Sequence, residues 1–125
     1  MQLTDTTLSL TQSDEDRLLR IVHVGYGYTL TRDADCDLPE EGLEVSIDIL
    51  GDDLISDDLL ARDIDRHVVA CRAGATTSQQ RRLVVAQALL DEDIGDDEIK
   101  LRISAHDASG TRLATAMTPI VRGAF

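Results

Sequence analysis

Residues 43–49 read LEVSIDI, and this stretch decides the fold class. Apolar and polar letters alternate strictly, which gives an extended chain one apolar side and one polar side. An α-helix would instead repeat its apolar residues every three to four positions. The period of two therefore predicts a β-strand with one face in a core, and the turn-forming letters GDD at 51–53 predict its end.

The same alternation recurs on both sides of this stretch. Toward the C-terminus it covers 99–105, and the letters DASG at 107–110 predict a turn into a returning strand over 111–122. Toward the N-terminus a longer alternation covers 22–30. Several alternating strands separated by turn signals are typical of a β-sandwich.

The 22–30 segment carries Gly25 and Gly27 on its polar side, which predicts a bulge or a close backbone approach there. Two shorter strands are expected at 6–11 and 67–72.

Two segments have helical features. Ser56 followed by two aspartates is typical of a helix N-cap and favours a short helix over 59–63. Residues 78–90 are rich in Ala, Gln, Leu and Arg, which favour a helix, whereas the letters LVV at 83–85 favour a strand. We predict a strand for 78–90.

Residues 97–122, DEIKLRISAHDASGTRLATAMTPIVR, resemble the last hairpin of immunoglobulin-like and related β-sandwich domains. The chain departs from antibody-type domains in having no core Trp and no suitably spaced Cys pair. The resemblance implies architecture only. We expect a single domain over residues 1–125, an all-β antiparallel β-sandwich of immunoglobulin-like type with room for one short helix.

The charge balance excludes two classes of partner. The chain has 24 acidic and 12 basic residues, a formal net charge of -12. Binding to nucleic acid or to an anionic membrane surface needs clustered Lys and Arg. We therefore expect neither nucleic acid nor a membrane as a partner.

The kind of charge is also informative, because the chain has 18 Asp, 6 Glu and 11 Arg, with Lys100 as the one lysine. This composition resembles that of proteins from salt-accumulating halophiles. Concentrated salt screens the repulsion between carboxylates, since the Debye length is about 3 Å at molar ionic strength. We expect marginal folding in low salt.

Two acidic clusters are candidate sites for a hard cation such as Ca²⁺. The spacing of Asp33, Asp35, Asp37 and Glu44 matches oxygen-ligand positions of a calcium loop, although Leu38 stands where such a loop needs Gly. The second cluster contains Asp91, Asp93, Asp96 and Asp97. In a chain this acidic, a solvated loop is the alternative interpretation for both clusters.

Tyr26 and Tyr28 share one strand face and are candidate interface residues, because tyrosine is enriched at protein contacts. The alternative is that both rings fill an aromatic-poor core.

No recognisable catalytic motif is present, so we expect no enzyme. The N-terminal letters MQLTDTTLSLTQ lack a basic segment and an apolar run, so we expect a chain that is cytoplasmic at synthesis.

The expected role of the chain is that of a structural protein that binds protein, as a homo-oligomer or larger assembly. The concrete form we favour is a virion component, such as a head-decoration, connector or tail protein, of a virus of a halophile. The alternatives are a cytoplasmic divalent-cation or small-ligand binding domain and an accessory subunit of an enzyme.

Overall fold

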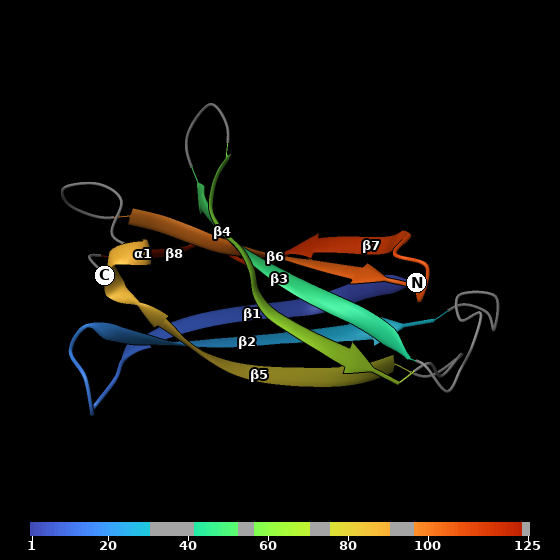
Figure 1. Cartoon of the computed structure of the whole chain (residues 1–125), viewed down its shortest axis with the longest axis horizontal. Coiled ribbons are helices and arrows are strands. Elements are labelled where there is room, and N and C mark those ends of the chain that lie inside the picture. Colours follow the sequence, from blue (N-terminus) through green and yellow to red (C-terminus); the bar gives the residue numbers. More distant parts are fainter. Residues whose placement is uncertain (31–41, 53–56, 71–75, 91–96, 124–125) are drawn as a thin grey trace.

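Figure 1 shows the computed structural model of the chain, which describes residues 1–30, 42–52, 57–70, 76–90 and 97–123. These residues form two antiparallel sheets packed against each other, so the expected all-β sandwich is confirmed. The elements in chain order are β1 (Gln2–Gln12), β2 (Leu19–Thr29), β3 (Leu43–Asp52), β4 (Asp57–Val69), β5 (Thr76–Ala86), α1 (Gln87–Leu90), β6 (Asp97–His106), β7 (Arg112–Met117) and β8 (Val121–Gly123).

The three-stranded sheet has the order β1-β2-β5, and the five-stranded sheet has the order β4-β3-β6-β7 with β8 also paired to β6. Every pairing is antiparallel. In Figure 1 the three-stranded sheet is the lower layer, and the chain passes between layers after β2, β4 and β5. Long-range pairing of this kind brings together residues far apart in the sequence.

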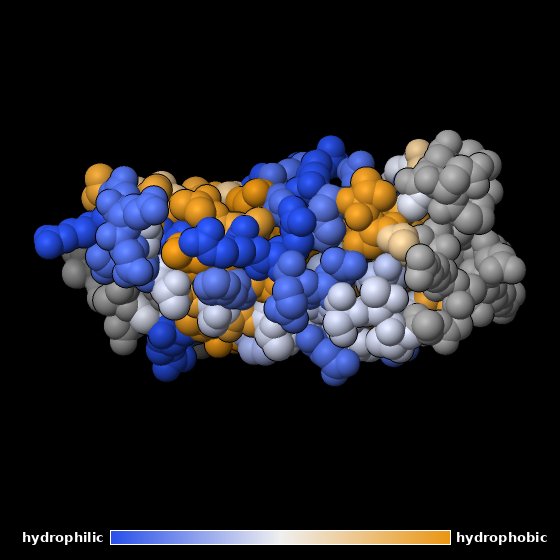
Figure 2. Space-filling view, turned by 90° about the horizontal axis from the view of Figure 1, so that it is seen from below, coloured by the Kyte–Doolittle hydropathy of each residue, from blue (hydrophilic) through white to orange (hydrophobic). Residues whose placement is uncertain are grey.

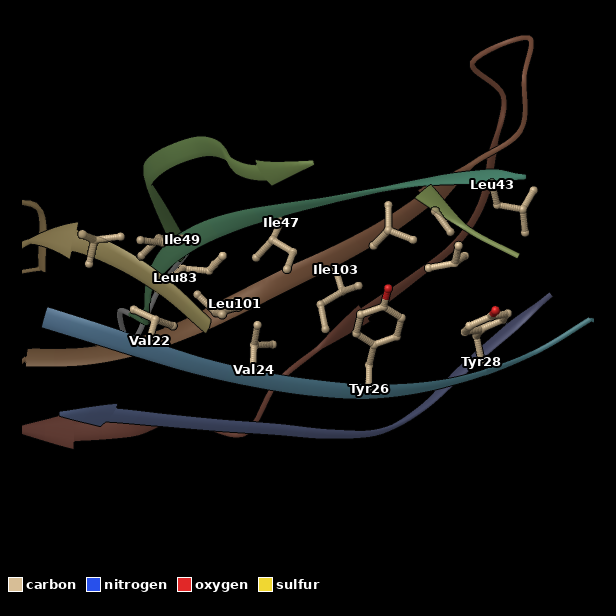
Figure 3. Close-up of a cluster of buried hydrophobic side chains, with 14 of the residues drawn as sticks. Val22, Val24, Tyr26, Tyr28, Leu43, Ile47, Ile49, Leu83, Leu101 and Ile103 are labelled. Carbon is tan, nitrogen blue, oxygen red and sulfur yellow. The ribbon is translucent and has the colours of Figure 1, made fainter. Parts of the chain in front are cut away.

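The core lies between the sheets and is almost entirely aliphatic, as Figure 3 shows for its central part. Alternate residues of β2, β3 and β6 supply most of it, in agreement with the alternation in the sequence. Burying a Val, Leu or Ile side chain contributes about 1.5–3 kcal/mol relative to leaving it exposed. The fully buried aliphatic members from these strands are Val22, Val24, Leu43, Val45, Ile47, Ile49, Ile99, Leu101 and Ile103.

Two helix expectations meet different outcomes. The short helix favoured over 59–63 is wrong, because these residues belong to β4, which pairs with β3 along its length. Backbone pairing to a neighbouring strand outweighs the weak propensity of a five-residue segment. The strand predicted for 78–90 is confirmed as far as Ala86, after which Gln87–Leu90 form the single turn α1.

The returning strand predicted over 111–122 forms as two pieces, β7 and β8. Pro119 lies between them and has no backbone N–H to give to the sheet. Thr118 anchors the break, since its N–H donates to the Leu101 carbonyl and its hydroxyl accepts from the Leu101 N–H, both at 2.9 Å.

The glycines of β2 lie where the sequence predicted a bulge or close approach. The bulge itself is in β1, where the register shifts between Thr4 and Thr7 and Asp5 has a φ of 51°. A Cβ at Gly25 would lie 2.6 Å from the Thr7 hydroxyl and from the Gln80 amide. The missing side chain thus lets these two polar groups lie flat against the outside of the sheet.

Candidate functional site

Most of the predicted cation ligands lie outside the described residues. This holds for Asp33, Asp35 and Asp37 of the first cluster and for Asp91, Asp93 and Asp96 of the second. The remaining two residues are placed on strands. Glu44 is in β3 and forms an ion pair with Arg66 at 3.1 Å, while Asp97 is buried at the start of β6.

Within the described ranges, no three His, Cys, Asp or Glu side chains come together as a metal site. Calcium binding by the two acidic clusters therefore stays a prediction.

Tyr26 and Tyr28 point into the space between the sheets (Figure 3) and are only 2% and 1% exposed. The structure thus corrects their assignment as interface residues, since neither ring is on the surface. Both rings fill the core, and each hydroxyl reaches a partner at the rim: that of Tyr28 donates to the Ala70 carbonyl at 3.0 Å. The hydroxyl of a buried tyrosine usually finds such a partner.

Tyr26 begins a chain of polar side chains that joins the two sheets. Its hydroxyl lies 2.5 Å from Nε2 of His67, and Nδ1 of His67 lies 2.8 Å from Oδ2 of Asp65. Arg81 of β5 completes the chain with two hydrogen bonds of 3.0 Å to the carboxylate of Asp65. With the Nδ1 proton donated to Asp65, Nε2 accepts the Tyr26 proton, so every member has a complementary partner.

Burial and pairing shift the pKa of each member. Burial lowers the pKa of His67, and the nearby Arg81 adds to this, although the hydrogen bond to Asp65 opposes it. Burial alone would raise the pKa of Asp65, but the hydrogen bonds from Arg81 and His67 outweigh it and leave the pKa below its ordinary value. Burial chiefly raises the pKa of Tyr26. At neutral pH the chain is a neutral Tyr–His pair held by an ionised Asp–Arg pair.

This polar chain links the two sheets through hydrogen bonds. The side chains of His67 and Asp65 are 8% and 12% exposed, so a substrate has little access to them. The sequence analysis missed it because Asp65 and His67 take core-facing positions in β4, where alternation leads one to expect apolar residues. The ladder pairs that place them, Ile47 with Asp65 and Val45 with His67, are set by the β4 register and not by local sequence.

The outer face of the three-stranded sheet is the most distinctive surface. We define the acid-free face as its outward residues, which alternate with the core residues of each strand and include no Asp or Glu. They are Thr7, Ser9 and Thr11 of β1, Ile21 and His23 of β2, and Ser78, Gln80, Arg82 and Val84 of β5. Asp5, at the bulge of β1, is the one acid within the three strands, and Asp14, Glu15 and Asp16 lie in the turn between β1 and β2.

One end of the acid-free face is apolar. Thr11, Ile21 and Val84 are paired across the three strands, and Val84 is 52% exposed. Beside this row, Leu18 is 68% exposed and lines a shallow depression of about 320 Å³ with Ala86, Gln87 and Ala88. Figure 2 looks at the molecule from this side and shows an orange apolar area next to blue and pale residues.

No family model, no curated protein and no solved structure matches this chain. Of the described helices, none is long and apolar enough to cross a membrane.

Proposed function

We propose that this protein is a non-catalytic assembly domain that binds a second copy of itself through the acid-free face. The observation that carries the proposal is the distribution of charge. The chain has 24 acidic residues in 125, yet the paired outward positions of the three-stranded sheet carry none of them, and the one acid within its strands is Asp5 at the bulge of β1. Charged residues are depleted at the centres of protein interfaces, so an acid-free surface on an acidic chain supports a contact role.

The shape and the exposed apolar residues of the acid-free face support the same role. Thr7 and Gln80 lie flat over Gly25, so this part of the surface is low and even. The exposed apolar residues Leu18 and Val84 at one end offer area whose burial would favour association, at about 25 cal/mol per Å². Isolated exposed apolar residues are common on any protein, but a contiguous exposed apolar patch is typical of a contact site.

The strand order supports an immunoglobulin-like arrangement. The order β1-β2-β5 corresponds to strands A-B-E of such domains, and the order β4-β3-β6-β7 corresponds to C′-C-F-G. Domains of this architecture serve many unrelated roles, so the proposal depends on the surface and not on the fold.

The test is the oligomeric state of a matched pair of variants. Val84→Asp places a carboxylate at the apolar end of the acid-free face, whereas Val68→Asp makes the same change at a 66% exposed position of β4 on the other sheet. In molar KCl we expect the wild-type chain and Val68→Asp to self-associate in sedimentation velocity, and Val84→Asp to be monomeric. A wild-type chain that is monomeric at high concentration, or a Val84→Asp variant that associates like Val68→Asp, would contradict the proposal.

Within this class, the role of a virion component of a virus of a halophile remains our narrower proposal. Its support is the halophile-type composition together with an assembly surface. Mass spectrometry of purified particles tests it, and we expect this chain in stoichiometric amount.

A further inference from the structure

The outer face of the five-stranded sheet contains a depression of about 280 Å³ whose floor is made of two serines. Ser46 of β3 and Ser104 of β6 are paired directly across the sheet and are 5% and 3% exposed. Their chain neighbours Val45 and Ile103 face the core, so both serine side chains point outward into the depression.

Four arginines from three strands surround this floor. Arg62 and Arg66 come from β4, Arg102 from β6 and Arg112 from β7, and two carboxylates, Asp48 and Asp63, also line the depression. These four are a third of the 12 basic residues of a chain whose net charge is -12. The depression is therefore a locally basic place on an acidic protein.

The four arginines differ in whether they already pair with a carboxylate. Arg102 donates to Oδ2 of Asp48 through Nη2 at 2.8 Å and through Nε at 3.1 Å, and Arg66 pairs with Glu44 at 3.1 Å. Arg62 and Arg112 make no hydrogen bond or ion pair with any other described residue, although the charge of Arg62 helps to lower the pKa of Asp48. Each guanidinium carries five N–H donors and no acceptor, so two exposed arginines remain available to an anion.

The floor supplies donors of a second kind. Neither serine hydroxyl makes a hydrogen bond to another residue in the described part of the chain. A hydroxyl can donate one hydrogen bond to an oxyanion, and it costs little space. His106, which is paired with Arg112 across β6 and β7, also lines the depression.

We propose that this depression binds a tetrahedral oxyanion, either inorganic phosphate or the phosphate group of a small phosphomonoester. The Ser46 and Ser104 hydroxyls donate to it from the floor, and Arg62 and Arg112 hold it from the sides. Arginine forks match the oxygen spacing of phosphate and form charge-assisted hydrogen bonds. A volume of about 280 Å³ suits a small ligand, and the net charge of -12 opposes a polyanion.

The experiment is a titration of the full chain with inorganic phosphate in KCl, followed by ¹⁵N NMR. We expect saturable shifts at the Ser46 and Ser104 amides and at the Arg112 side-chain N–H. Arg112→Gln and Ser104→Ala should each weaken binding by about tenfold, the loss expected for one hydrogen bond to a charged group. The matched change Arg82→Gln on the acid-free face should leave the affinity unchanged.

Glycerol phosphate is the second probe, and tighter binding than that of inorganic phosphate would identify an ester as the preferred form. Shifts that do not saturate at tens of millimolar phosphate would overturn the proposal. So would an equal loss of affinity in Arg82→Gln and Arg112→Gln, because that result would indicate attraction to general positive charge. The monomeric Val84→Asp chain should bind phosphate like the wild type, which separates this site from the assembly surface.

Discussion

The two outer faces of this sandwich are built in opposite ways. The acid-free face of the three-stranded sheet carries hydroxyls, amides, Val84 and Ile21, with His23 and Arg82 as its only basic groups. The outer face of the five-stranded sheet is crossed by ion pairs, among them Asp48–Arg102 and Glu44–Arg66. The chain thus places ion pairs on the outer face of one sheet and keeps carboxylates out of the paired outward positions of the other.

This difference teaches how an acidic protein can still form contacts. Where carboxylates cover a surface, a second acidic protein is repelled unless salt screens the charges. Where they are absent, close approach brings no such repulsion. The absence of a residue type from a whole face is therefore as informative as a motif.

The largest effect we expect comes from removing salt, because it acts on every carboxylate at once. On lowering KCl from molar to millimolar, repulsion should remove most of the about 5–15 kcal/mol by which folded domains are stable. Circular dichroism should show a falling melting temperature and loss of the β-sheet signal. An unchanged spectrum and melting temperature would show that repulsion between the carboxylates does not limit folding.

The next effect concerns Asp48, the buried carboxylate of the charged face. It accepts hydrogen bonds from the Asp63 N–H at 2.8 Å and from Arg102, and it holds the β4 bulge at Asp63, whose φ is 51°. Asp48→Ala leaves these donors without an acceptor, which should cost about 2–3 kcal/mol in a urea melt. Thr7→Ala on the acid-free face should change stability by less than about 0.5 kcal/mol, and equal losses in the two variants would refute the contrast.

The pH dependence of stability should also come from the five-stranded sheet. Burial lowers the pKa of His67, so this histidine binds a proton more readily in the unfolded chain than in the folded chain. The contribution of neutral His67 to stability is therefore complete above about pH 6.5 and is lost as pH falls through the folded pKa. Thermal melts between about pH 7.5 and about pH 5.5 should show this loss in the wild type and in His23→Gln, and a smaller loss in His67→Gln. An identical slope in His67→Gln would exclude His67 as the source.

Asp48 and Asp65 define a second, more acidic window. Hydrogen bonds to arginine and other donors outweigh burial and hold the pKa of each carboxyl below 3.8. Their contribution is therefore present above that value and is lost as pH falls through the folded pKa.

A small effect on stability, less than about 1 kcal/mol, is expected for Gly25→Ala. The heavy atoms nearest to the new Cβ are those of the Thr7 hydroxyl and the Gln80 amide, at 2.6 Å, so these two side chains must shift. Moving them should roughen the acid-free face and weaken self-association in sedimentation. Gly110→Ala is the opposite control: it has open space but a φ of +85°, so it should lower stability by about 1 kcal/mol and leave association intact.

Much of the fold could be predicted from the sequence, and little of the candidate sites. The strands at 43–49, 99–105 and 22–30 were found because alternation is a local pattern. The helix expected over 59–63 was wrong because a cap signal says nothing of the strand beside it. The two tyrosines were recognised as a pair, but only packing shows that their rings lie inward.

By itself the sequence determined an aliphatic, alternating, all-β chain with an excess of aspartate, because side-chain period and charge are properties of neighbours along the chain. The tertiary structure alone decided which side chains meet: Tyr26 with His67, Asp65 with Arg81, and four arginines around Ser46 and Ser104. These meetings depend on strand register and on bulges at Asp5 and Asp63. A shift of one residue turns every following side chain to the opposite face, and only packing of the whole core fixes that choice.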